Sequence, residues 1–140
     1  MPIQFFFLSK NISIANRGAL KMFIQNIFRK EKRRLESLTY IFCSDEYLLQ
    51  INKDHLKHDF YTDIVTFDLS ETKNAVTGEI YISTDRVRDN ASQLGTTLKE
   101  EIHRVVFHGA LHLCGYKDKT TKDTKKMRNA EDKLLSNYLK

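Results

Sequence analysis

The sequence predicts an α+β fold in which strands and helices alternate along one chain. Four short segments are rich in β-branched and aromatic residues, as strands are. Several longer segments repeat apolar residues at helical spacing. Two of the strand-like segments follow one another across a polar loop, which fits a hairpin or two neighbouring strands. Strands mixed with helices in this way are typical of a small layered α+β architecture.

Two strands and two helices are expected in the N-terminal half. Residues 3–8, IQFFFL, fit a strand and are too few for a signal-peptide core or a membrane span. Residues 17–34 fit a helix with one apolar face, one basic face and a basic C-terminal end that complements the helix dipole. Residues 38–43, LTYIFC, fit a second strand. Ser44 is then the expected N-cap of a short helix over residues 44–52.

The middle of the chain is expected to form the hairpin and a third helix. Residues 63–68, DIVTFD, and 78–83, GEIYIS, have the composition of strands. In the second segment, isoleucines alternate with tyrosine and serine, which is the strand period. Residues 83–95 fit a helix that Ser83 or Thr84 opens and Gly95 closes.

Two further helices are expected towards the C-terminus. Thr97 and Glu100 form a capping-box pattern at the start of a helix that runs through residues 98–115. Its apolar positions recur at helical intervals, which predicts a buried, central helix. A last helix is expected over residues 123–139. Its apolar side consists of Met127, Ala130, Leu134, Leu135 and Tyr138.

Length and composition restrict the class of protein. A chain of 140 residues with 41% hydrophobic content, one proline and no Gly/Ser-rich linker is expected to form a single domain over residues 1–140. A net charge of +5 favours a polyanionic partner such as nucleic acid. Cys43 and Cys114 are too few for a disulfide framework, and no apolar run reaches membrane-spanning length. A cytoplasmic protein without a membrane segment is expected, with Cys43 buried.

The stretch HGALHLCGYKD, residues 108–118, holds two histidines at metal-ligand spacing. On a helix, His108 and His112 lie one turn apart on one face, so both imidazoles can reach the same point. Gly115 can turn the chain back just beyond the helix and bring Asp118 towards both histidines. These three side chains are the predicted ligands of a zinc-like ion, with one position left for water. The competing interpretation is a pair of hydrogen-bonded core histidines.

Two neighbouring residues narrow the chemistry of this stretch. Cys114 is a competing soft donor, but it lies two residues beyond His112 and should leave the helix on another face. Gly109 stands where the HExxH motif of zincin peptidases has its general base, so a metallopeptidase is the weakest hypothesis. A metal can still activate water and neutralise a phosphodiester. The residues therefore favour hydrolysis of an anionic substrate by water, and they identify no catalytic side chain.

At these residues the sequence resembles the YbeY family of bacterial endoribonucleases, whose signature reads HGxLHLxGYDH. Residues 62–67, TDIVTF, are similar to the family's TDVLSF. Residues 78–83, GEIYIS, are similar to its GDIxIS. Asn52, Asp59 and Glu100 agree as well, so the resemblance spans most of the chain.

The resemblance implies both a fold and a function. The fold would be a mixed, roughly four-stranded sheet packed by about five helices, with the architecture of a zincin-like metal hydrolase. The activity would be that of a metal-dependent endoribonuclease specific for single strands, acting in 16S rRNA 3′-end maturation and in ribosome quality control. The implied cofactor is one zinc ion. The implied partners are ribosomal RNA, the small ribosomal subunit and assembly factors.

Two departures from the family pattern bear on the site. Asp118 stands where the family has its third histidine, and Lys117 replaces the preceding aspartate. A harder oxygen ligand weakens the case for zinc over other divalent ions. Leu56 stands where the family carries an arginine that contacts phosphate, and Lys57 or His58 would have to take its place. The alternative function is therefore a non-catalytic ribosome-assembly factor with a structural metal.

Other polar residues have both a structural and a functional interpretation. Thr62 and Asp63 either begin a strand or shape the cleft around the metal. His103 is expected in the core or behind the ligands, because it lies well around the helix from His108. The basic residues within 117–128 either contact RNA phosphates or belong to a solvated turn before the last helix.

Overall fold

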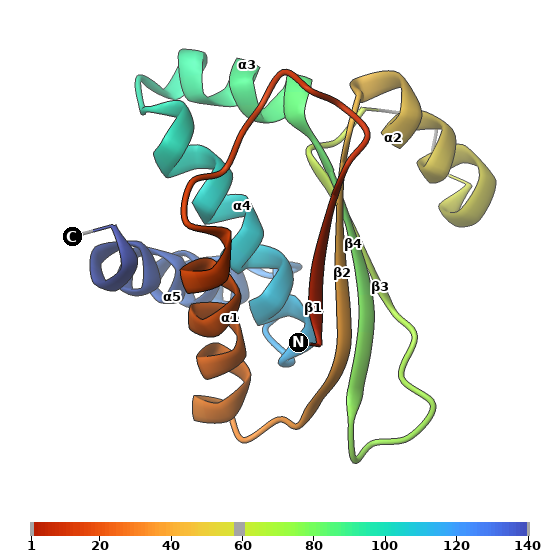
Figure 1. Ribbon diagram of the computed structural model, residues 1–140, viewed down its shortest axis with the longest axis vertical. Helices are drawn as coiled ribbons and strands as arrows, with labels where there is room; N and C mark the ends of the chain where they lie inside the picture. The colour runs from red at the N-terminus through yellow and green to blue at the C-terminus, as the bar shows by residue number, and fades with distance from the viewer. Residues whose placement is uncertain (1, 58–60, 140) are drawn as a thin grey trace.

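A computed structural model describes residues 2–57 and 61–139 of the chain. Within these ranges, helices pack on a mixed four-stranded sheet (Figure 1), which confirms the expected α+β fold. The strands are β1 (Ile3–Phe7), β2 (Leu35–Cys43), β3 (Ile64–Asp68) and β4 (Val76–Ser83). The helices are α1 (Arg17–Lys30), α2 (Asp45–Ile51), α3 (Thr84–Leu94), α4 (Leu98–Leu113), α5 (Thr121–Tyr138) and the π-helix η1 (Asn52–Leu56). None of them is long and apolar enough to cross a membrane.

The sheet has the strand order β1-β2-β4-β3. β2 pairs in parallel with both β1 and β4, whereas β3 and β4 are antiparallel. The expected hairpin is therefore confirmed. β3 is an edge strand that contacts α4, and its residues 64–66 line the cleft described below.

The sheet separates a large core from a small one. α1, α4 and α5 cover one face, and α2 lies beyond the other (Figure 1). Ile80 and Ile82 of β4 face the large core, whereas Tyr81 between them faces the small one. This alternation follows from the pleat of the strand. Cys43 is fully buried with Leu48 in the small core, as expected for that cysteine.

Helix α4 is the buried central helix that the apolar pattern predicts. Ten of its side chains or backbone positions are buried, and the hydroxyl of Thr97 accepts a hydrogen bond at its N-terminus. Gly109 lets the helix approach β4 closely, because a Cβ at this position would lie 2.7 Å from Cδ1 of Ile80. The histidine-bearing turns are therefore held firmly against the sheet.

Some element boundaries differ from the expectation. The prediction that the first helix continues to residue 34 was wrong, since α1 ends at Lys30. Lys32 takes a left-handed backbone conformation with φ of 59°, which interrupts the helical hydrogen bonding. α2 continues into η1, a π-helix that the apolar pattern did not indicate. α5 begins at Thr121, two residues before the expected start, with Thr120 as its N-cap.

Candidate metal centre

The two predicted ligand histidines lie on the last two turns of α4. The centroids of the His108 and His112 rings are 5.5 Å apart, and the rings are inclined at 76°. Their side chains are 21% and 36% exposed, and both line a cleft rather than the core. The spacing of four residues therefore places both imidazoles on one accessible face.

The turn after α4 brings Asp118 to this face. Gly115 has a φ of 105°, a conformation that side chains disfavour and glycine adopts without strain. The backbone N–H of Tyr116 then donates to the carbonyl of Leu111 at 3.0 Å, which reverses the chain. The hydroxyl of Thr124 on α5 shares its one hydrogen between the carbonyl of Thr120 at 2.9 Å and that of Asp118 at 3.2 Å, which links the returning segment to the start of α5.

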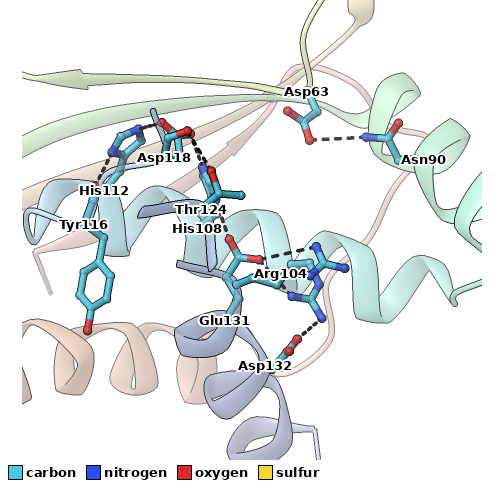
Figure 2. Close-up of polar contacts among 11 residues, drawn as sticks. Asp63, Asn90, Arg104, His108, His112, Tyr116, Asp118, Thr124, Glu131 and Asp132 are labelled. Atoms are coloured by element: carbon cyan, nitrogen blue, oxygen red, sulfur yellow. Dashed lines mark hydrogen bonds and ion pairs between the residues drawn. The ribbon is translucent and has the colours of Figure 1, made fainter. Parts of the chain in front are cut away.

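The carboxylate of Asp118 faces both imidazoles (Figure 2). Its Oδ2 lies 3.6 Å from Nε2 of His108, and its Oδ1 lies 3.7 Å from Nε2 of His112. One potential ligand atom from each residue lies within 4.8 Å of the others. Three groups separated in this way can converge on one metal ion, so this set could hold one.

The other ring nitrogens are held by acceptors. Nδ1 of His108 lies 2.6 Å from Oε2 of Glu131, and Nδ1 of His112 lies 2.8 Å from the carbonyl oxygen of Tyr116. Both partners are hydrogen-bond acceptors, so Nδ1 donates in each ring, and a neutral ring of this tautomer presents the lone pair of Nε2. Both lone pairs are thus available on the side where Asp118 lies. This is the usual orientation of metal-binding histidines, so the residues fit a metal ion.

Glu131 connects His108 to a buried ion-pair network. Its side chain is 5% exposed, and its Oε1 lies 3.0 Å from a guanidinium nitrogen of Arg104. A second nitrogen of Arg104 lies 2.7 Å from Asp132 (Figure 2). Burial alone would lower the pKa of His108, but the hydrogen bond and charge of Glu131 outweigh it and raise that pKa. Glu131 therefore both orients and polarises the imidazole.

A cleft with a volume of about 560 Å³ opens beside the three predicted ligands. Its walls come from η1, β3 and the segment before it, α4, the turn that carries Asp118, and α5 as far as Glu131. Besides the three ligands, its lining includes Asn52, Leu56, Thr62, Asp63, Ile64, Val65, Thr66, Glu101, Arg104, Val105, Thr124, Met127, Arg128 and Glu131. The functional interpretation of Thr62 and Asp63 as residues that shape the cleft is thus supported. Burial raises the pKa of both Asp63 and Glu101 above the usual range for carboxyl groups.

Two other candidate donors do not take part in the site. Cys114 is 5% exposed, and burial raises the pKa of its thiol to about 12. A thiol of that pKa stays protonated at neutral pH and is a poor ligand. His103 is 4% exposed, its Nδ1 lies 2.7 Å from the carbonyl of Lys99, and its ring packs against Tyr138. His103 therefore belongs to the core, which is one of the two positions expected for it from the sequence.

The expected substitutes for the family arginine lie at the edge of what the structure describes. Leu56 does line the cleft, so an apolar side chain occupies that position. Lys57 is exposed, with a φ of 57°, and is not among the lining residues. His58 and Asp59 fall outside the described residues, so their predicted roles stay predictions.

Gly109 shows why a glutamate base is missing beside the first histidine. A Cβ there would meet Ile80 and Ile64 at 3.2 Å or less, because the position faces the sheet. A larger side chain could not enter without displacing the core. The expectation that this site lacks the peptidase base is consistent with its packing.

Glu131 is the important residue that sequence reasoning missed. It lies on α5 between Met127 and Leu135, each four residues away, and all three are buried. A carboxylate in the middle of a predicted apolar stripe is rarely buried without a partner. The position of Glu131 among the apolar residues of the last helix could therefore have indicated a buried carboxylate with a partner.

Comparison with known proteins places these features in a family. The family model described as Endoribonuclease YbeY matches residues 7–139. Proteins named Endoribonuclease YbeY are 52% identical in Cytophaga hutchinsonii, covering 96% of this chain and 94% of the relative, and 41% identical in Christiangramia forsetii, covering 93% and 91%. The solution structure of TM1509 from Thermotoga maritima superposes with a TM-score of 0.68 and 29% identity, covering 95% of this chain and 86% of that one.

These matches agree with the resemblance seen at the histidine stretch and with the observed sheet and helices. They extend over nearly the whole chain and over most of the length of the relatives. The enzyme class expected from the sequence is the one for which these relatives are named. The chain therefore belongs to the YbeY family of endoribonucleases.

Proposed function

We propose that the chain is a metal-dependent endoribonuclease that cleaves single-stranded RNA in the cleft beside His108, His112 and Asp118. The observation that carries the proposal is the convergence of three ligand atoms within 4.8 Å on the wall of an open cleft. The family to which the chain belongs supports the reaction class. Its net charge of +5 suits a polyanionic substrate.

Zinc is the ion that we propose for this site. Two imidazole nitrogens and one carboxylate oxygen form a three-residue ligand set of the kind found in catalytic zinc sites. The carboxylate of Asp118 is harder than the histidine of the family signature, so the site should also accept other divalent ions. Which ion binds most tightly is a matter for direct titration.

The residues of the site have separate tasks in this proposal. A divalent ion would supply a Lewis acid that activates water and neutralises charge on the phosphodiester. Glu131 accepts a hydrogen bond from Nδ1 of His108, and the carbonyl of Tyr116 accepts one from Nδ1 of His112, so both rings keep their orientation. Ile64, Val65 and Thr66 of β3 form one part of the cleft wall. We identify no side chain as the general acid or base.

A purely structural metal in a ribosome-assembly factor is the alternative. Structural zinc sites are normally closed by four protein ligands. Among the described residues the metal-ligand set contains three, and Asp118 and His112 are 42% and 36% exposed beside the cleft. Exposure of this degree favours a site that substrate can reach, and the alternative is not favoured.

The cellular role that we propose follows from the family. RNA cleavage at the 3′ end of 16S rRNA and in ribosome quality control would place the chain with the small ribosomal subunit and its assembly factors in the cytoplasm. This part of the proposal can be tested by sequencing the 3′ ends of small-subunit rRNA in cells depleted of the protein. Extended 3′ ends are expected, and ends of normal length would contradict this role.

Cleavage of single-stranded RNA by the metal-loaded protein tests the activity. His112→Ala should lower the rate by about 100-fold or more, because it removes a ligand of the catalytic ion. His55→Ala is the matched control, since His55 is exposed and does not line the cleft. RNA left intact by a wild-type protein that retains its metal would support the assembly factor instead.

A further inference from the structure

The charges that line the cleft are unbalanced. Its lining contains four carboxylates, from Asp63, Glu101, Asp118 and Glu131, and two guanidinium groups, from Arg104 and Arg128. An excess of acidic groups suits a divalent cation, but it opposes the approach of a phosphodiester. One divalent ion would cancel this formal excess of two, so a guanidinium that is free to turn towards the substrate would add attraction for the phosphate.

Arg104 is already committed to other partners. Its side chain is 11% exposed, and its nitrogens lie 3.0 Å from Glu131 and 2.7 Å from Asp132. Turning towards a substrate would leave the buried carboxylate of Glu131 without this partner, which is costly. Arg104 therefore serves the network behind His108.

Arg128 is in a different position. Its side chain is 56% exposed, and its ion-pair contact with Glu131 is a long 4.0 Å approach. On α5 it lies four residues after Thr124 and three before Glu131, so all three share the helix face that lines the cleft. Glu131 is buried and already paired with Arg104, whereas the guanidinium of Arg128 is exposed and 4.0 Å away, so this long contact contributes little and Arg128 can exchange it for a new partner.

η1 contributes Leu56 to the lining, and an aliphatic side chain cannot bind phosphate. A guanidinium can donate two parallel hydrogen bonds to one phosphate, which fixes its orientation as well as its position. Thr124 and Arg128 thus give α5 a polar, cationic contribution to the same cleft that the three ligand residues line.

We infer that Arg128 is the residue that binds the RNA phosphate in this cleft, so that α5 supplies the phosphate-binding cation of the active site. This inference rests on the proposed endoribonuclease function and adds to it a substrate-binding residue. Arg128 makes this contact when the RNA is bound, and the contact holds a phosphate in the cleft that the metal ligands line.

The test compares Arg128→Gln, Arg128→Lys and Lys133→Gln in their metal-loaded forms, with a single-stranded RNA oligonucleotide as substrate. Lys133→Gln is the matched control, because Lys133 is an exposed cation of the same helix that does not line the cleft. Arg128→Gln should lower kcat/KM by about 10- to 100-fold, mainly through a higher KM. Arg128→Lys should recover part of this loss, since it keeps the charge without the fork of donors.

The salt dependence separates a phosphate contact from a structural role. Losing one phosphate contact should reduce the slope of log kcat/KM against log salt by about 0.7 for single-stranded RNA, whereas Arg128→Lys and Lys133→Gln should keep the wild-type slope. The affinity for zinc, measured by titration without RNA, should be unchanged in Arg128→Gln. A role in supporting Glu131 predicts the reverse, weaker zinc binding with an unchanged slope, and that result would overturn the inference.

The outcomes also separate this inference from the function on which it rests. If wild-type protein cleaves RNA and requires His112, but Arg128→Gln behaves like Lys133→Gln, then the inference is wrong and the function stands. If the metal-loaded wild type leaves the RNA intact, both are wrong.

Discussion

At the scale of single residues, the site depends on which nitrogen of each imidazole carries hydrogen. Acceptors at Nδ1 of His108 and His112 leave both Nε2 lone pairs pointing to the side of Asp118. The acceptor at His112 is the backbone carbonyl of Tyr116, which remains whatever side chain stands at position 116. The acceptor at His108 is the side chain of Glu131, so this histidine is the one whose support can be changed by mutation.

Glu131→Gln should weaken metal binding by about 10- to 100-fold, which is the usual cost of losing a carboxylate behind a ligand histidine. The amide keeps the size of the side chain but removes the charge that polarises His108. Competition with a chelator measures the affinity. Asp132→Asn is the control, because Asp132 also contacts Arg104 but is 55% exposed and does not reach His108. Equal affinity in wild type and Glu131→Gln would contradict the role assigned to this carboxylate.

His103 should make the stability of the protein depend on pH. Burial lowers the pKa of His103 below 6.5, against a smaller opposing effect of its hydrogen bond to Lys99. As pH falls through 6.5, the unfolded chain binds a proton at this residue before the folded one does, so stability is lost towards acid. Between pH 7.5 and pH 5.5, the wild type should therefore lose more free energy of unfolding than His103→Gln, which stays neutral, as measured in urea. The same loss in both proteins would show that this histidine titrates normally.

At the scale of elements, the ends of helices position the ligands. α4 is fixed against β4 through Gly109, and the turn at Gly115 decides where Asp118 lies relative to the end of that helix. The third ligand therefore depends on backbone conformation outside any helix or strand. Thr124 then ties this turn to the first turn of α5.

Gly115→Ala should destabilise the fold by about 1–3 kcal/mol, because a side chain is strained at a φ of 105°. A new Cβ would also approach Nη2 of Arg33 at 3.1 Å. Since the turn carries Asp118, metal affinity should fall as well. Thermal unfolding and zinc titration measure the two effects.

Gly18→Ala serves as the control, because a Cβ there meets nothing within 4 Å. It should change stability by less than about 1 kcal/mol and leave the affinity for zinc unchanged. Unchanged zinc affinity in Gly115→Ala would contradict the role of the turn.

At the scale of the whole molecule, local patterns predicted the elements, and only long-range packing determined how they assemble. The period-two pattern of residues 78–83 and the caps Ser44 and Thr97 were sufficient for their elements, because they depend on neighbouring residues. Of the two caps that the sequence allowed for α3, Ser83 or Thr84, the structure uses Ser83. The parallel pairing of β2 with β1 and β4 could not be derived from periodicity. This pairing joins strands that are distant in sequence. The alternation of side chains within a strand does not indicate which other strand it pairs with, or in which direction.

The site shows the same division. His108, His112 and Asp118 are separated by one helical turn and one glycine bend, so local geometry was enough to bring them together. Glu131 and Arg128 reach the cleft only because α5 packs against α4, a contact that no local pattern encodes. The early end of α1 depends on a left-handed Lys32, a conformation that lysine seldom adopts and that composition does not indicate.

The central claim is that His108, His112 and Asp118 together bind one metal ion. Elemental analysis of protein purified without added metal, for wild type, Asp118→Ala and the control Asp89→Ala, tests it most directly. Asp89 is a 52% exposed carboxylate of α3 that does not line the cleft. We expect one divalent ion per chain in wild type and in Asp89→Ala, and a loss of most of it in Asp118→Ala. The same metal content in all three proteins would contradict the claim.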